Sequence, residues 1–286
     1  MRFVRFLRPF ILKISSFQLS TDGISTIKKK SRTDITGPFQ SWRKAVQAST
    51  GYDSDLILEK TKNALLKVKN REAVYERDSV LFNKIQYSWP LLAGLMWAAA
   101  QSEGRLNVLD FGGSLGSTYY QNKIFIDALP EVRWNIIEQP KHVSVGRELF
   151  ENDKLKFFST IEEYSIENEP NVVVMSGILQ YLESPYELIE RLLVLSSTCA
   201  IIDLTPFWDG DNDITCVQTV PPCIYEASYP LWIFSKQKFI NYLNSLNYHI
   251  LAEFETLKAP PSDICLYYQG LIIVRKGTEA LDGIYE

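Results

Sequence analysis

Apolar residues follow two different rhythms along the chain, and the change comes just after residue 104. Over residues 37–104 apolar positions recur every three or four residues, which is the period of a helix with one buried face. Helices are expected over Ser41–Ala48, Ser54–Lys69 and Ser88–Gln101. The segment Arg71–Phe82 mixes charged and aromatic residues and is taken as part of the same helical lead-in. A lead-in of this size has too small a core to be expected as an independent domain.

Over residues 105–276, short apolar runs alternate with helical stretches. This alternation predicts an α/β fold, with a mainly parallel sheet that carries helices on both faces. Strands are expected at Asn107–Phe111, Arg133–Glu138, Lys154–Phe158, Val172–Ser176 and Ala200–Leu204. Helices are expected at Tyr119–Leu129, Lys141–Asn152, Pro185–Ser196 and Ser235–Leu246.

The end of this region departs from the alternation. Two further strands, His249–Thr256 and Cys265–Arg275, follow each other across a loop that contains Pro260 and Pro261. Consecutive strands with no helix between them are typical of an antiparallel hairpin, which would close one edge of the sheet. The sequence therefore predicts a Rossmann-like sheet of seven strands with an antiparallel last hairpin, followed by a tail over residues 277–286.

The most informative chemical signal is the run VLDFGGSLGS at Val108–Ser117, in which an apolar strand enters a glycine-rich turn. Glycine permits positive φ and close backbone approach, so the free amides of the next helix can face a ligand. A dinucleotide fingerprint G-x-G-x-x-G laid on Gly112 would need glycine at Ser114 and Ser117, and therefore fails twice.

A second template, acid-x-G-x-G-x-G, is typical of enzymes that use S-adenosylmethionine. It fits Asp110, Gly112 and Gly116, with Ser114 at the middle position and Gly113 beside the first glycine. A carboxylate at the strand end suits the ammonium of the methionine part of that cofactor, whereas it would repel a pyrophosphate. A sterically required turn without a ligand is the alternative interpretation.

Further candidates stand at the carboxyl ends of the other expected strands, where open α/β sheets bind ligands. Glu138 and Gln139 follow the second strand, and Glu138 is expected to accept hydrogen bonds from the two ribose hydroxyls of the cofactor. The fourth strand ends at Ser176 and Gly177, which are expected to form a wall of the cofactor site. A solvated strand-end acid is the alternative for Glu138.

Catalytic candidates are expected beside this cofactor site. Asp203 ends an apolar strand, where burial raises the pKa of a carboxyl group and prepares a general base; a hydrogen-bonded structural aspartate is the alternative. Residues 218–235 are rich in aromatics and prolines and are expected as a loop over the cleft, with Tyr225 and Glu226 as its polar candidates. His142 follows the second strand and could reach the cleft, but near a helix start it is expected at the surface and receives no catalytic role.

Cysteine and charge usage narrow the class further. The four cysteines stand apart without a C-x-x-C pair and the chain has two histidines, so neither a disulfide framework nor a metal site is expected, and a cytoplasmic setting is the simpler one. Residues 1–33 hold eight basic residues and one acid, which leaves the arm at +7 and the rest of the chain at −11. The acidic body is not expected to bind nucleic acid.

The basic arm has an amphipathic pattern of its own. Apolar positions recur at helical spacing between the arginines of residues 1–14, which suits a helix lying in the plane of a membrane surface. Pro9 would kink such a helix, and a disordered or core-docked arm is the alternative. Residues 15–36 are rich in Ser, Thr and Lys and are expected as a linker.

Taken together, several segments resemble a group of S-adenosylmethionine-dependent methyltransferases encoded among bacterial surface-polysaccharide (lipopolysaccharide and capsule) genes. The segments are Asn107–Ser117, Ile136–Pro140, Val173–Pro185, Ile201–Phe207 and Pro221–Ser235, with Trp42, Gly51–Asp53, Tyr75–Asp78 and Phe82 in the lead-in. The resemblance spans residues 37–275. It implies the class I methyltransferase fold, with Asp110, Gly112 and Gly116 in the first cofactor motif and Glu138 at the ribose.

The expected function is methyl transfer from S-adenosylmethionine to an oxygen of a saccharide or sugar nucleotide, in the cytoplasm or against the inner face of its membrane. One rival is a nicotinamide-dependent Rossmann enzyme, which the two missing glycines and the final hairpin disfavour. The other is a non-catalytic partner or scaffold in polysaccharide assembly, which the basic arm and the absence of an evident catalytic histidine favour. The acceptor and the oligomeric state stay open.

Overall fold

The structure is a computed structural model that describes residues 34–51, 54–77, 79–166, 168–195, 199–220, 227–260 and 262–277. The basic arm therefore lies outside the described residues, and so do Tyr225, Glu226 and nearly all of the tail.

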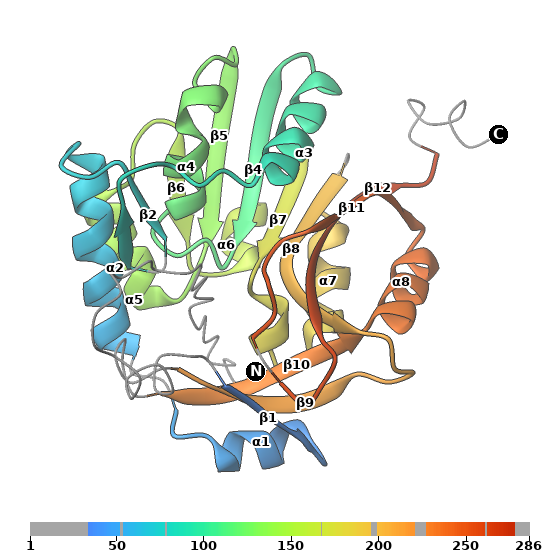
Figure 1. The fold of residues 1–286 in the computed structure, drawn as a ribbon. Coiled ribbons are helices and arrows are strands. Elements are labelled where there is room, and N and C mark those ends of the chain that lie inside the picture. The colour runs from blue at the N-terminus through green and yellow to red at the C-terminus, as the bar shows by residue number, and fades with distance from the viewer. Residues whose placement is uncertain are drawn as a thin grey trace.

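A mixed sheet of seven strands in the order β6-β5-β4-β7-β8-β12-β11 forms the centre of the molecule (Figure 1). Five of them run parallel, namely β4 (Arg105–Phe111), β5 (Glu131–Ile137), β6 (Leu155–Phe158), β7 (Val172–Ser176) and β8 (Cys199–Trp208). The late strand β12 (Tyr267–Arg275) is antiparallel to both of its neighbours, β8 and β11 (Tyr248–Glu255). The predicted α/β fold, with a mainly parallel sheet and an antiparallel pair of strands late in the chain, is confirmed.

Two apolar cores lie on opposite faces of this sheet, because successive side chains of a strand point to opposite sides. Val108 of β4 belongs to one core and Leu109 to the other. The first core contains side chains of α2 (Ser54–Lys69), α3 (Trp89–Ala100), α4 (Ser117–Ile126) and α5 (Pro140–Leu149). The second contains side chains of α6 (Ile161–Ser165), the 3-10 turn η1 (Leu179–Tyr181), α7 (Pro185–Leu193) and α8 (Lys236–Ser245). Burial on both faces explains why the central strands are continuously apolar.

Three strands beyond the expected seven extend the sheet past β8. They are β1 (Asp34–Phe39), β9 (Ile214–Thr219) and β10 (Ser228–Ser235), which pair in the order β1-β9-β10 and join β8 through Phe234 and Ser235. The loop expected over residues 218–235 and the linker expected up to residue 36 are therefore wrong in these parts. Pro230 suggested a loop. At this position, however, β10 pairs with β9 alone, so no strand on its other side loses a hydrogen bond because proline lacks an N–H.

The lead-in is only partly helical. Helices α2 and α3 form close to the expected boundaries, and α1 (Trp42–Ala48) begins after Ser41, whose side chain caps it. The segment Arg71–Phe82 instead contains an antiparallel hairpin of β2 (Tyr75–Arg77) and β3 (Val80–Phe82). Strands of three residues are too short to show a two-residue period, which is why the helical prediction for this segment was wrong.

Candidate active site

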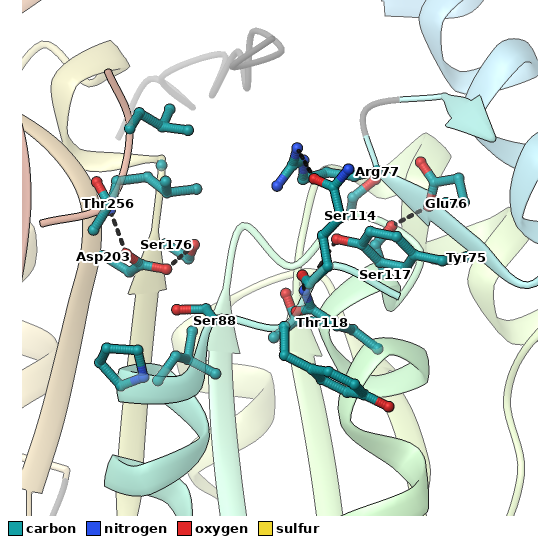
Figure 2. A pocket seen from close by; sticks show the side chains of 18 of the residues that line it. Tyr75, Glu76, Arg77, Ser88, Ser114, Ser117, Thr118, Ser176, Asp203 and Thr256 are labelled. Atoms are coloured by element: carbon teal, nitrogen blue, oxygen red, sulfur yellow. Dashed lines mark hydrogen bonds between the residues drawn. The ribbon is translucent and has the colours of Figure 1, made fainter. Parts of the chain in front are cut away.

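A cavity of about 270 Å³ lies at the carboxyl ends of β4, β5, β7 and β8, and the lead-in closes it from the other side (Figure 2). The sheet contributes strand-end residues to its wall, among them Ser114, Glu138, Ser176, Gly177 and Asp203. The lead-in contributes Tyr75, Glu76 and Arg77 of β2, Gln86, and Ser88 at the start of α3. Five of the residues expected at the site from sequence are thus brought together on one surface.

The glycine-rich turn after β4 has a left-handed backbone at Gly112, as its sequence predicts, but not at Gly113. Gly112, Ser114 and Gly116 have φ values of 72°, 56° and 104°. A side chain at Gly112 would put its Cβ 2.9 Å from Ile178 Cγ1, and one at Gly113 would lie 2.5 Å from Asp110 Oδ2. The turn therefore needs glycine for both conformation and space. Ser114 lines the cavity, while the three glycines of the motif are not among the lining residues.

Asp110 lies inside the sheet and not on the cavity wall. It is 1% exposed, its Oδ2 accepts a hydrogen bond of 3.1 Å from the indole of Trp134, and its carboxyl group fills the space that a Cβ at Gly113 would need. Asp110 and Gln139 are both absent from the lining residues, although sequence reasoning expected them to face the cofactor. In this structure Asp110 supports the glycine turn from beneath.

Glu138 links the end of β5 to the same turn from the cavity side. The residue is 7% exposed and lines the cavity. Its Oε2 accepts from the backbone N–H of Ser114 at 3.3 Å, and its Oε1 accepts from the N–H of Gln139 at 3.0 Å. Because backbone donors fix the carboxylate, its position at the cavity wall does not depend on a flexible side chain.

Asp203 and Ser176 are partners in the parallel register of β7 and β8 and form a polar pair at the opposite wall (Figure 2). Asp203 is 3% exposed; its Oδ1 accepts from the N–H of Leu204 at 2.8 Å, and Ser176 Oγ donates to its Oδ2 at 3.5 Å. Thr256, after β11, also lines the cavity, and its Oγ1 is buried without a hydrogen-bond partner among the described residues. Tyr225 and Glu226, the other catalytic candidates, lie outside the described residues.

Sequence reasoning missed the part of the site that comes from the lead-in. Glu76 is fully buried and accepts from Ser117 Oγ at 2.6 Å and from the N–H of Ser79 at 2.7 Å, which docks β2 onto the start of α4. Glu76 and Arg77 had appeared only as part of a family resemblance. A three-residue strand gave no periodic signal that would place them.

His142 was expected at the surface, and this is wrong. It is 6% exposed, lines the cavity, and has a buried Nδ1 without a hydrogen-bond partner in the described part of the chain. Helical spacing could have predicted this burial. His142 and Gly146 are four residues apart, so they lie on one face of α5, and this face is buried together with Val143. The preceding Lys141 points outward and pairs with Asp55 of α2 at 2.6 Å.

The charged groups of the cavity are mostly acidic. Among the described residues, four carboxyl side chains line it, those of Glu76, Glu138, Asp203 and Glu255, against the single guanidinium of Arg77. A concave site with this excess of one sign favours ligands of the opposite sign. The cavity is therefore suited to a ligand with a net positive charge.

A second, more open groove of about 660 Å³ adjoins the cavity and shares Glu255 and Leu257 with it. Tyr267 lines this groove and donates a hydrogen bond of 2.7 Å to Asp209. Burial, followed by this hydrogen bond, raises the pKa of Tyr267 well above its ordinary value. Tyr267 therefore stays protonated near neutral pH and does not act as a base.

Two further features of the described residues bear on function, the grouping of possible metal ligands and the length and hydropathy of the helices. The described residues contain no group of three or more His, Cys, Asp or Glu side chains placed to hold a metal ion. Within the same residues, no helix has both the length and the hydropathy needed to cross a bilayer.

The chain matches no protein-family model and no curated protein. Among solved structures it is similar to magnesium protoporphyrin IX methyltransferase from Synechocystis PCC 6803 with bound SAM, at 13% identity and a TM-score of 0.44, over 79% of this chain and 99% of that one. It is also similar to the N-terminal domain of EvdMO1, crystallised with SAH and D-fucose, at 11% identity and a TM-score of 0.46, over 78% and 97% of the two chains. An amino pentose methyltransferase from Micromonospora echinaspora matches at 9% identity and a TM-score of 0.43, over 66% of this chain and 92% of that one. These similarities concern the course of the chain alone.

Proposed function

We propose that the protein is an S-adenosylmethionine-dependent methyltransferase. The observation that carries the proposal is the acidic cavity at the carboxyl ends of four adjacent parallel strands, with four carboxyl groups against one guanidinium. S-adenosylmethionine has a sulfonium, an ammonium and one carboxylate, and so carries a net positive charge that complements this wall. A nicotinamide dinucleotide would bring a pyrophosphate into the same acidic surroundings, which is unfavourable.

The residues present fit such a cofactor. Glu138 is fixed by backbone donors and offers acceptor capacity for the ribose hydroxyls. His142, whose buried Nδ1 has no hydrogen-bond partner in the described part of the chain, lines the same cavity and is a further polar candidate for ligand contact. Ser114 of the glycine turn and, on the other side, the pair Ser176–Gly177 also line the cavity (Figure 2).

The volume of the cavity also fits one ligand rather than two. About 270 Å³ is slightly below the ~300 Å³ at which typical ligand clefts begin, so a bound cofactor would fill it. An acceptor would then enter from the adjoining groove, where Glu255 and Leu257 mark the boundary.

When bound, S-adenosylmethionine supplies a methyl group on a sulfonium centre that an acceptor oxygen displaces in line. The protein positions both reactants, excludes water and removes the proton of the acceptor hydroxyl. We assign this proton to Asp203, whose carboxylate lines the cavity from the middle of β8 and is oriented by Leu204 and Ser176. Tyr225 and Glu226 stay candidates for acceptor contact.

For the acceptor we propose a hydroxyl of a saccharide or sugar nucleotide from surface-polysaccharide biosynthesis. The family resemblance of the sequence motivates this choice. The adjoining groove supports it, because Tyr267 offers an aromatic face beside the polar side chains of Asp209, Lys236 and Glu253.

The first experiment is titration calorimetry with S-adenosylmethionine and S-adenosylhomocysteine, followed by transfer of labelled methyl groups to a cell-envelope extract. The proposal requires binding of both compounds and a labelled saccharide product. Binding without transfer would favour a non-catalytic partner in polysaccharide assembly, and binding of a nicotinamide cofactor alone would refute the proposal.

The role of Asp203 is tested with Asp203→Asn. We expect S-adenosylhomocysteine affinity to be retained and turnover to fall by about 100-fold or more, as for loss of a general base. Asp211→Asn is the matched control, since Asp211 is an exposed acid on the loop after the same strand and lines neither hollow. Full turnover in Asp203→Asn would exclude Asp203 as the base.

A further inference from the structure

We propose that Arg77 is the carboxylate-binding group of the cavity and that it takes the α-carboxylate of the methionine part of the cofactor. The inference rests on the proposed function and adds a binding residue that the sequence did not predict.

The first support is the place of Arg77. Figure 2 shows its side chain on the side of the cavity formed by Ser114 and Ser117, across from Asp203 and Ser176. The preceding residue, Glu76, accepts a hydrogen bond from Ser117 Oγ, and Ser117 is the first residue of α4 directly after the glycine turn. This contact fixes β2, and with it Arg77, beside the turn.

The second support is that Arg77 has no anionic partner among the described residues. Its Nη2 donates to Gln86 Oε1 at 3.1 Å, and its guanidinium lies 5.7 Å from the centre of the Phe82 ring. No carboxylate in the described part of the chain lies within ion-pair distance of it, although four carboxyl groups line the same cavity. A guanidinium has five N–H donors, so Gln86 and Phe82 orient the group and leave most donors for a ligand.

The third support is the charge of the ligand. Arg77 is the only Lys or Arg among the described residues that line the cavity, and the α-carboxylate is the only anionic group of S-adenosylmethionine. The start of α4, where Ser117 is bonded to the neighbour of Arg77, has free backbone amides that also favour a negative charge. One guanidinium among four carboxyl groups suits a single carboxylate better than the two charges of a diphosphate.

The test compares two ligands that differ in the amino-acid part. S-adenosylhomocysteine carries the carboxylate, whereas 5′-methylthioadenosine has the same adenosine and sulfur without it. In calorimetry, Arg77→Met should weaken S-adenosylhomocysteine binding by about 10- to 100-fold, the range for a lost hydrogen bond to a charged group, and leave methylthioadenosine binding unchanged. Arg77→Lys should retain part of the S-adenosylhomocysteine affinity that Arg77→Met loses, because lysine keeps the positive charge but not the forked N–H donors of arginine. Arg133→Met, at an exposed site on β5, should change neither affinity.

The remaining outcomes separate this inference from its foundation. If the wild-type protein binds neither ligand, the proposed function fails as well. If Arg77→Met binds S-adenosylhomocysteine as the wild type does, the assignment is wrong, and a raised KM for an acidic acceptor in that variant would move the carboxylate from cofactor to acceptor. Equal loss of both ligands would make Arg77 a structural residue and would also overturn the inference. Unchanged methylthioadenosine binding serves as the control for folding.

Discussion

Two acids on neighbouring strands lie near one glycine turn, and only the one beyond the end of its strand lines the cavity. Asp110 shares a face of β4 with Val108, so its side chain enters the same core as Trp134, to which it is hydrogen-bonded. Glu138 lies one residue beyond β5, past the last paired position of the sheet, and reaches the cavity wall. A strand-end carboxylate is thus a ligand candidate only when the strand no longer directs it into a core.

Replacing Glu138 tests its expected role at the ribose. Glu138→Gln keeps the size of the side chain but removes its charge, so we expect about a tenfold or greater loss of S-adenosylhomocysteine affinity, the scale of a hydrogen bond to a charged group. Calorimetry measures the change. Glu131→Gln, at the exposed start of the same strand, is the control and should bind as the wild type does. Unaltered affinity in Glu138→Gln would remove Glu138 from the cofactor site.

The glycine at the start of the turn is required for stability as well as for binding. Gly112→Ala places a Cβ 2.9 Å from Ile178 Cγ1 at a φ of 72°, so strain and overlap add. We expect a loss of unfolding free energy of about 2 kcal/mol or more, measured by urea denaturation. Gly51→Ala separates the two effects, because Gly51 has a φ of 93° but no atom within 4 Å of the position that a Cβ would take. If Gly112→Ala loses no more unfolding free energy than Gly51→Ala, the side chain of Ile178 moves aside at little energetic cost and the overlap is unimportant.

Sequence reasoning found the site residues that come after long strands and missed those that come from short or helical elements. Ser114, Glu138, Ser176 and Gly177 line the cavity at or just after strand ends, as expected. Asp203 lines it too, but from the middle of β8, because this strand continues to Trp208 and not only to the expected Leu204. The contribution of the lead-in was not predictable, because contacts between β2 and α4 join segments forty residues apart and leave no local pattern. Tertiary contacts, not periodicity, bring these side chains into the site.

At the scale of elements, the hairpin β2–β3 and strand β10 show why some predictions were wrong. The hairpin turns at Ser79, which has a φ of 65°, yet no glycine or asparagine signals this turn in the sequence. In β10 the aromatic and proline content suggested a loop, but Tyr229, Leu231 and Ile233 alternate and enter one core. Helices α2 and α3 were predicted because each is long enough to show its period.

The hairpin is held to the glycine turn by the hydrogen bond between Ser117 and Glu76, and a single substitution tests this. Ser117→Ala removes one donor from a buried carboxylate, which typically costs about 1–3 kcal/mol. We expect faster hydrogen exchange at residues 75–82 and weaker S-adenosylhomocysteine binding, because Arg77 loses its fixed position. Ser165→Ala is the control, since the exposed hydroxyl of Ser165 donates to the carbonyl of Ile161 within the same helix, α6. Equal exchange in the two variants would mean that β2 is docked by other contacts.

At the scale of the whole molecule, the lead-in and the sheet share one core. Leu58 and Leu65 of α2 and Leu91 and Leu95 of α3 belong to the same apolar cluster as Val108 of β4. Helix α3 packs closely on β8, as a Cβ at Gly94 would lie 2.7 Å from Ile201 Cδ1. The boundary expected near residue 104 is therefore a boundary of sequence pattern, and the cavity between lead-in and sheet is assembled only when both are folded.

This shared core predicts that the chain unfolds as one unit. Removing residues 34–104 would expose the face of the sheet that α3 covers and leave its apolar side chains in water, at about 25 cal/mol for each Å² exposed. We expect a fragment of residues 105–276 to aggregate or to lack a cooperative transition, while the whole chain shows a single calorimetric transition whose midpoint rises with S-adenosylhomocysteine. Two separated transitions in the whole chain, or a folded fragment that binds this ligand with full affinity, would show that the lead-in is a separate domain and that its side of the cavity is dispensable for the cofactor.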